Sequence, residues 1–123
     1  MMQELVGIVR QEKDMLRALE GIATFKTRAA TVTVTGNREY NPGWHTALDL
    51  PNLLTVAEAV TRSALERKES RGGHFRDDFP EKNEANAHFN ILVTRDSNGE
   101  MMISRSPIQP MRDDLQQIVE ENK

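Results

Sequence analysis

Apolar residues recur at helical spacing along most of this chain. From Asp14 onward they return every three or four residues with charged side chains between them, which predicts an amphipathic helix reaching about Arg28. The apolar positions of this helix are Met15, Leu16, Leu19, Ile22, Ala23 and Phe25. Residues 31–35 alternate like a short strand before a Gly-Asn turn, but they fit the frayed end of a helix equally well.

A second helix is predicted to begin at Asn41, because Asn is a favoured N-cap and Pro42 fits a first turn. Pro51 is expected to interrupt or restart it, since a proline inside a helix removes a hydrogen bond. The strongest helical pattern then runs from Asn52 to about Lys68, and the pair Gly72-Gly73 is expected to end it.

This strongest helix carries an apolar stripe at steps of four, three and four residues, made of Leu53, Ala57, Val60 and Ala64. Its small alanines would let a neighbouring helix approach closely. If the stripe packs against the face formed by Leu16, Leu19 and Ile22, Leu53→Ala should destabilise the fold by about 2–4 kcal/mol.

Beyond the glycines the apolar pattern changes from helical to alternating. Residues 89–94 and 101–104 flank Asp96-Ser97-Asn98-Gly99, and Asn-Gly between apolar runs is the strongest short-range signal of a β-hairpin. A short amphipathic helix follows over residues 111–119. The predicted fold is mainly α: a small bundle of about three to four helices with a C-terminal β-hairpin extension over residues 86–106 and a short terminal helix.

Length and charge limit the class of protein. The chain has 123 residues and a mass of 14.0 kDa, which fits one domain over residues 1–123. Its 16 Lys and Arg against 19 Asp and Glu give a net charge of −3, so it lacks the basic field that attracts nucleic acid. It contains no cysteine, and its longest apolar run is far shorter than the ~18 residues of a membrane span. We therefore expect no nucleic-acid partner and no direct membrane insertion.

Two features favour a domain that is incomplete by itself. Hydrophobic residues make up 37% of the chain and aromatic residues 5%, so the core is small for an independent fold. Met1 and Met2 lead into residues 3–10 without a capping Ser, Thr or Asp, as though a helix were entered part-way. A piece cut from a longer chain and a native start with a frayed first turn explain this equally well.

The densest group of reactive side chains follows the strongest helix, in residues 67–80. Opposite charges alternate there around two glycines, and the segment closes with Phe79-Pro80. Because arginine binds planar carboxylates bidentately, a turn that fixes such groups suits docking, although a solvated face is the simpler alternative. The residues predicted to dock a neighbouring domain or partner are Glu69, Ser70, Arg71, His74, Arg76, Asp77 and Asp78.

Catalytic and cofactor sites find less support. An acid/base pair of His74 and Asp77 is chemically permitted, but no nucleophile stands beside it, and the three histidines lack the spacing of metal ligands. Gly72-Gly73 follows a predicted helix, whereas phosphate-binding loops follow a strand and open a helix. The sequence thus predicts no catalytic, cofactor-binding or metal-binding residue in this chain.

The segment from Glu66 to Pro80 resembles a family signature. It reads E-R-K-E-S-R-G-G-H-F-R-D-D-F-P and is similar to the R-x-E-S-R-G-A-H-x-R-x-D-(F/Y)-P signature in the C-terminal domain of succinate dehydrogenase and fumarate reductase flavoprotein subunits. Residues 6–10 resemble the family's V-G-I-F-R helix end, and residues 40–47 its next helix start. The L-x-N-M-L-x-x-A-E helix of the family is matched by Leu50, Asn52, Leu53, Leu54, Ala57 and Glu58. The resemblance covers about residues 4–95.

The resemblance implies a C-terminal helical domain cut from a longer flavoprotein, packed on an FAD-binding domain and a capping domain. The parent would interconvert succinate and fumarate by FAD-dependent hydride transfer with residues outside this chain, so the fragment alone would bind no cofactor and catalyse nothing. Its implied partners are the remainder of the flavoprotein subunit and an iron–sulfur subunit, reached through the turn from Glu69 to Asp78. The implied location is cytoplasmic, peripheral at the inner face of the membrane through partner subunits.

The sequence also departs from the family pattern. Gly73 stands where alanine is usual, Ala87 stands where many respiratory members carry tryptophan, and the tail over residues 101–123 lacks a basic, aromatic-ended close. L-aspartate oxidase and other fumarate reductase-like flavoproteins share a related E-S-R-G turn, so the substrate of the parent stays open. A free-standing helical module that binds a protein through the charged turn is the alternative from another class.

Overall fold

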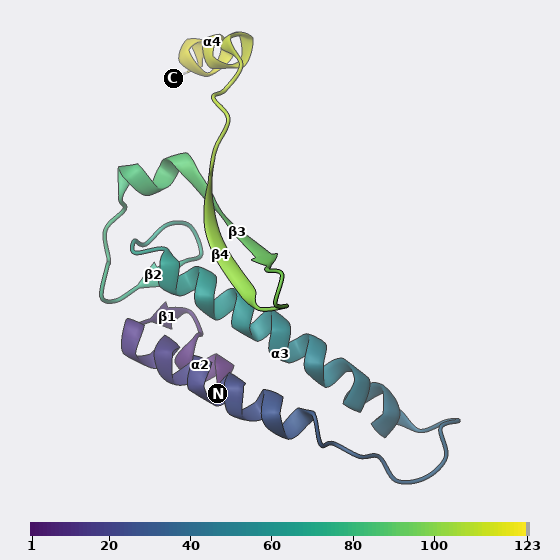
Figure 1. Ribbon diagram of the computed structural model, residues 1–123. Coiled ribbons are helices and arrows are strands. Elements are labelled where there is room, and N and C mark those ends of the chain that lie inside the picture. The colour runs from purple at the N-terminus through teal and green to yellow at the C-terminus, as the bar shows by residue number, and fades with distance from the viewer. Residues whose placement is uncertain (123) are drawn as a thin grey trace.

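Two long helices lie side by side and form the body of the molecule (Figure 1). The computed structural model describes residues 1–122, in which α2 spans Glu12–Ala29 and α3 spans Pro42–Glu66. The start of α3 follows the sequence prediction: the Asn41 side chain accepts a hydrogen bond from the Gly43 N–H at 3.0 Å, and Pro42 occupies the first turn.

α3 is longer at its beginning and shorter at its end than the sequence predicts. It continues without a break through Pro51, so the predicted interruption is wrong. Proline removes one hydrogen bond, and the packing of a 25-residue helix along α2 outweighs that loss. The helix ends at Glu66 rather than at Gly72-Gly73, and the two glycines belong to a later turn.

The predicted apolar stripe of α3 is not the side that packs on α2. Leu53 is 64% exposed and Val60 43% exposed, and only Ala64 of that stripe is buried. The buried positions of α3 are Leu54, Glu58, Thr61 and Ala64. Apolar spacing alone pointed to the wrong side, because the packed side includes a carboxylate and a hydroxyl whose polar atoms find partners within the fold.

The core between the helices is small, as the composition indicates. Its centre is formed by Val6, Met15, Ala18 and Ala64, with Met2, Leu5 and Leu65 packed against it. Ile22 of α2 is also buried, whereas Leu16 is half exposed. Of the two alternatives for residues 31–35, the structure shows the frayed helix end and no strand: the N–H groups of Thr31 and Val32 bond to the carbonyls of Arg28 and Ala29.

Short strands and turns complete the fold around the end of α3. The described elements are α1 (Met2–Leu5), β1 (Val9–Arg10), β2 (Phe75–Arg76), the 3-10 turn η1 (Glu84–His88), β3 (Phe89–Arg95), β4 (Met101–Pro107) and α4 (Asp113–Glu121). β1 pairs with β2 in parallel, and β3 pairs with β4 in the predicted antiparallel hairpin, in register from Phe89 opposite Pro107 to Arg95 opposite Met101.

The hairpin lies against α3, and α4 stands apart at the end of a connecting segment (Figure 1). None of the residues of α4 is buried. The predicted fold class is confirmed: four helices, a small antiparallel hairpin and a short terminal helix. None of the helices within residues 1–122 is long and apolar enough to cross a membrane.

Candidate functional site

The charged segment after α3 forms a loop, residues 67–83, that we call the signature loop. Strand β2 lies inside it and pairs with β1, so Val9 lies opposite Phe75 and Arg10 opposite Arg76. The Asp77 N–H also donates to the Arg10 carbonyl at 2.9 Å. These bonds fix the loop to the N-terminal segment, although more than 60 residues separate the two in sequence.

Glu69 is fully buried at the centre of the loop. Its carboxylate accepts hydrogen bonds from Arg67 Nη1 at 2.6 Å, from Arg71 Nε at 3.1 Å and from the Asn83 N–H at 3.0 Å. Burial by itself raises the pKa of Glu69, but these donors outweigh burial and the net pKa lies below its ordinary value. The group therefore stays ionised and holds both ends of the loop together.

Arg67 connects this centre to the hairpin. Its guanidinium donates to the Asn86 carbonyl at 2.9 Å and to the Phe89 carbonyl at 3.0 Å, and it lies over the Phe89 ring at 5.0 Å. The sequence prediction left Arg67 out of the docking residues. Arg67 lies within the charge alternation and at the first arginine of the signature, but neither signal shows that its side chain reaches residues 19 to 22 positions away.

Arg76 is the second fully buried charge of the loop. It binds Asp78 bidentately, with two bonds of 2.6 Å, and donates to the Ala64 carbonyl at 3.0 Å, which satisfies an orphan acceptor at the end of α3. Asp78 in turn accepts the Glu12 N–H at 2.9 Å at the start of α2. The hydrogen bonds from Arg76 lower the pKa of Asp78 to about 2, although burial opposes this.

Ser70 ties the same region together through its hydroxyl. The Ser70 Oγ accepts the Arg76 N–H at 2.9 Å and donates to the Phe79 carbonyl at 2.9 Å. Within residues 1–122, every buried side-chain nitrogen and oxygen has a hydrogen-bond partner. The buried polar groups of the signature loop thus serve the fold of the loop itself.

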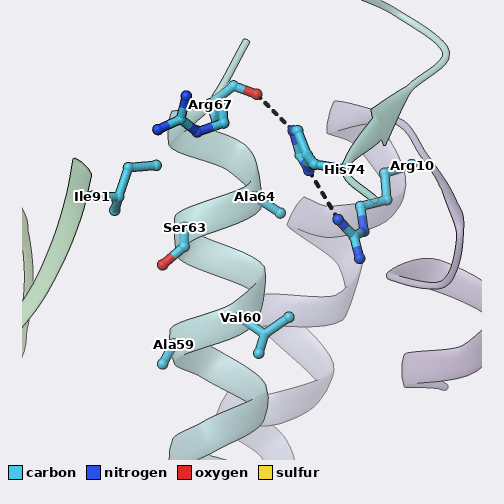
Figure 2. Close-up of a pocket in the computed structure, with 8 residues that line it drawn as sticks. All are labelled: Arg10, Ala59, Val60, Ser63, Ala64, Arg67, His74 and Ile91. Atoms are coloured by element: carbon cyan, nitrogen blue, oxygen red, sulfur yellow. Dashed lines mark hydrogen bonds between the residues drawn. The ribbon is translucent and has the colours of Figure 1, made fainter. Parts of the chain in front are cut away.

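His74 bridges β1 and the end of α3 (Figure 2). Because arginine only donates, the contact of 2.9 Å from Arg10 Nη1 makes His74 Nδ1 an acceptor, and Nε2–H then donates to the Arg67 carbonyl at 3.0 Å. Burial lowers the pKa of His74, and nearby arginine charges lower it further. The ring is therefore neutral, with both nitrogens occupied.

The tip of the loop is the turn Arg71 to His74, closed by backbone bonds of 2.8 and 3.0 Å between these two residues. Gly72 has a φ of +59°, in the left-handed region where glycine is favoured, whereas a Cβ at either Gly72 or Gly73 would meet open space. The two glycines of the tip are exposed, whereas Arg71 and His74 on either side of them are partly buried.

The seven predicted docking residues thus lie together in one loop but differ in exposure. Glu69, Ser70 and Arg76 are buried, and Arg71 and His74 are partly buried. The exposed pair is Asp77 and Asp78, of which Asp77 accepts a hydrogen bond from Gln11 Nε2 at 2.7 Å. The buried members can shape a docking surface only by holding the loop, so docking by this loop stays a prediction for its exposed residues.

The loop offers no assembled acid/base site. His74 makes its two ring hydrogen bonds to Arg10 and Arg67, and Asp77 binds Gln11 instead. His45 and His88 are exposed on other elements. Among the residues that the structure describes, no three His, Asp or Glu side chains gather as metal ligands.

The chain's own residues do not fit FAD. Its parallel strand pair is only two residues long on each side, and the turn with two glycines follows α3 instead of joining a strand to the start of a helix. The start of α2, which lies beside the signature loop, is occupied by the Asp78 carboxylate, which accepts the Glu12 N–H at 2.9 Å.

The match to a family model extends over residues 1–120, and the description of that family is "Fumarate reductase flavoprotein C-term". The chain belongs to this family. The fumarate reductase flavoprotein subunit of Haemophilus influenzae is 35% identical over 108 residues, which are 87% of this chain and 18% of that subunit. The L-aspartate oxidase of Yersinia pestis is 39% identical over 85 residues, 66% of this chain and 14% of that enzyme.

A solved flavoprotein chain has the same fold. It comes from the Mycobacterium smegmatis Sdh1 complex with UQ1, is 40% identical, and superimposes with a TM-score of 0.87 over 98% of this chain and 21% of its own. The chain therefore spans about a fifth of the length of such relatives. It is a C-terminal domain of the succinate dehydrogenase and fumarate reductase flavoprotein type, as the signature predicted.

Proposed function

We propose that this domain is a structural part of a longer flavoprotein subunit that interconverts succinate and fumarate by FAD-dependent hydride transfer. In this role it packs on the FAD-binding and capping domains and on an iron–sulfur subunit, and it supplies no catalytic residue. FAD and the dicarboxylate bind in the remainder of the subunit. The proposed location is the cytoplasm, at the inner face of the membrane through partner subunits.

The observation that carries this proposal is the internal pairing of the signature loop. Glu69 and Arg76, two charged residues of the family signature, are buried and bonded to their own chain. They stabilise the conformation of the loop, and their charged groups are not free to react with a substrate. A domain whose defining motif serves only its fold is consistent with chemistry placed elsewhere in the subunit. The family match and its small share of the relatives' length support the same view.

The test compares the 123-residue chain with the complete gene product. We expect the purified chain to show no bound flavin absorbance and no succinate-dependent dye reduction, whereas the complete product shows both. Stoichiometric FAD binding or succinate oxidation by the chain alone would place chemistry in this domain and contradict the proposal.

A second candidate, supported by the relative from Yersinia pestis, is the same domain in an L-aspartate oxidase. The complete gene product distinguishes the two, since an L-aspartate oxidase would reduce the dye with L-aspartate and leave succinate unchanged. A gene product of 14.0 kDa would instead favour the free-standing protein-binding module.

A further inference from the structure

One side of α3 is apolar and uncovered. α2 packs on one side of this helix and the hairpin lies on a second side. The third side carries Leu53, Val56 and Val60, which are 64%, 61% and 43% exposed. Steps of three and four residues place these side chains in one stripe, which we call the free α3 face.

The free α3 face leads into an open groove of about 460 Å³, and Val60 belongs to both. Figure 2 shows this groove along α3, with Ile91 of the hairpin on one side and Arg10 and His74 on the other. Its surface is mostly apolar, and Arg10 is one of the two arginines that line it, the other being Arg67. A ligand that extends from the free α3 face into this groove would therefore contact Arg10.

Arg10 differs from the arginines of the signature loop because it has no carboxylate partner in the described part of the chain. Arg67 and Arg71 pair with Glu69, and Arg76 pairs with Asp78. The guanidinium of Arg10 bonds only to the neutral His74 ring and, at 3.4 Å, to a backbone carbonyl. Its charge is thus available to an acidic group from outside.

We propose that the free α3 face and Arg10 dock the flavin-binding part of the same subunit, which contributes apolar side chains to the face and a carboxylate to Arg10. This inference rests on the proposed function, and it assigns the contact to a surface other than the signature loop. An apolar stripe beside an unneutralised cation suits a polypeptide segment that carries both kinds of group.

The position of α4 supports an occupant from the same subunit. The matched chain from Mycobacterium smegmatis covers 98% of this one, so most of α4 has a counterpart there. None of the residues of α4 is buried, and Leu115, Ile118 and Val119 are exposed. A helix whose apolar residues do not pack on its own domain is consistent with a contact to another part of a longer subunit.

The experiment introduces Leu53→Asp, Val60→Asp and Arg10→Gln separately into the complete gene product and into the 123-residue chain. Glutamine keeps a donor for the His74 ring while removing the charge of Arg10. The matched control is Leu48→Asp, because Leu48 is 58% exposed on the same helix but five residues, or about 140°, away from Leu53. The readout is the rate at which a nonspecific protease releases the domain from the complete product, detected by antibody.

We expect the two aspartate variants to speed release about tenfold or more, and Arg10→Gln about threefold, while Leu48→Asp changes nothing. All four should leave the melting temperature of the chain alone nearly unchanged. Normal release from the complete product in both aspartate variants would overturn the docking assignment and leave the proposed function intact. Normal release in Arg10→Gln would overturn the role of the cation. A chain that dimerises alone and loses the dimer in Leu53→Asp would make a second copy the occupant.

A complete gene product no larger than this chain would bear on more than the docking surface. It would contradict the proposed function itself, and the docking assignment with it.

Discussion

At the level of single residues, the side chains of the signature stabilise the fold of one loop. Glu69 and Arg76 are fully buried charges, and each is satisfied by partners within its own chain. Removing one partner of a buried ion pair costs far more than the pair contributes, because the remaining charge stays buried. The residue types of the signature are therefore required by the fold, whatever the loop contacts.

The two glycines at the loop tip provide a matched pair of substitutions. Gly72→Ala should destabilise the chain by about 1–2 kcal/mol, because its φ of +59° disfavours a residue with a Cβ. Gly73→Ala should change stability by less than about 0.5 kcal/mol, since that Cβ meets open space. Urea unfolding of the two variants measures the difference, and equal losses would contradict the turn geometry.

Asp78 makes stability depend on pH in the acid range. Its folded pKa of about 2 lies below the ordinary 3.8, so the unfolded chain takes up the proton first as the pH falls. The stabilisation is complete above about pH 3.8 and is lost as the pH falls toward 2. After allowance for solvent screening, it amounts to about 1 kcal/mol.

Unfolding free energies of the wild type and Asp78→Asn, measured from pH 5 to pH 2, test this dependence. The difference between them should shrink toward pH 2. A constant difference over the whole range would show that the Arg76–Asp78 bond does not control the protonation of Asp78.

At the element scale, the sequence located most helices and the hairpin but not the packing side of α3. Capping by Asn41 and the Asn-Gly hairpin turn are local signals, and both predictions were correct. The side that faces α2 could not be inferred from apolar spacing, because Glu58 and Thr61 lie on it. Glu58 is accommodated there by Lys26 and Arg62, and Lys26 lies on the other helix.

Two neighbouring leucines of α3 test which side is packed. Leu54→Ala should destabilise the chain by about 2–4 kcal/mol, because Leu54 is only 7% exposed. Leu53→Ala should cost less than about 0.5 kcal/mol, against the larger loss expected from the sequence, because its side chain already meets solvent. Thermal melting of both variants is the measurement. A larger loss of stability for Leu53→Ala than for Leu54→Ala would show that the side of α3 predicted from the sequence is the packed one.

Removal of α4 tests whether this helix supports the domain. Truncation after Gln109 should leave the melting temperature of the chain within about 2 °C of the intact value, since none of the residues of α4 is buried. Calorimetry of the truncated and intact chains measures this. A fall of many degrees would show that α4 packs on its own domain in solution.

At the scale of the whole molecule, the chain has a small core and large apolar surfaces left uncovered on α3 and α4. The composition predicted the small core, and the signature predicted the family. Both can be read from the sequence without knowing which distant segments contact each other. The link from Arg67 to the hairpin and the unpaired charge of Arg10 depend on contacts between distant segments, which no local pattern reports.

We propose that this chain acts as one domain of a larger flavoprotein subunit. The most direct test is the mass of the native gene product, measured by immunoblot with antibodies raised against the 123-residue chain. A band several times heavier than 14.0 kDa is the predicted result. A band at 14.0 kDa alone would contradict the claim and turn attention to a separate partner of the signature loop.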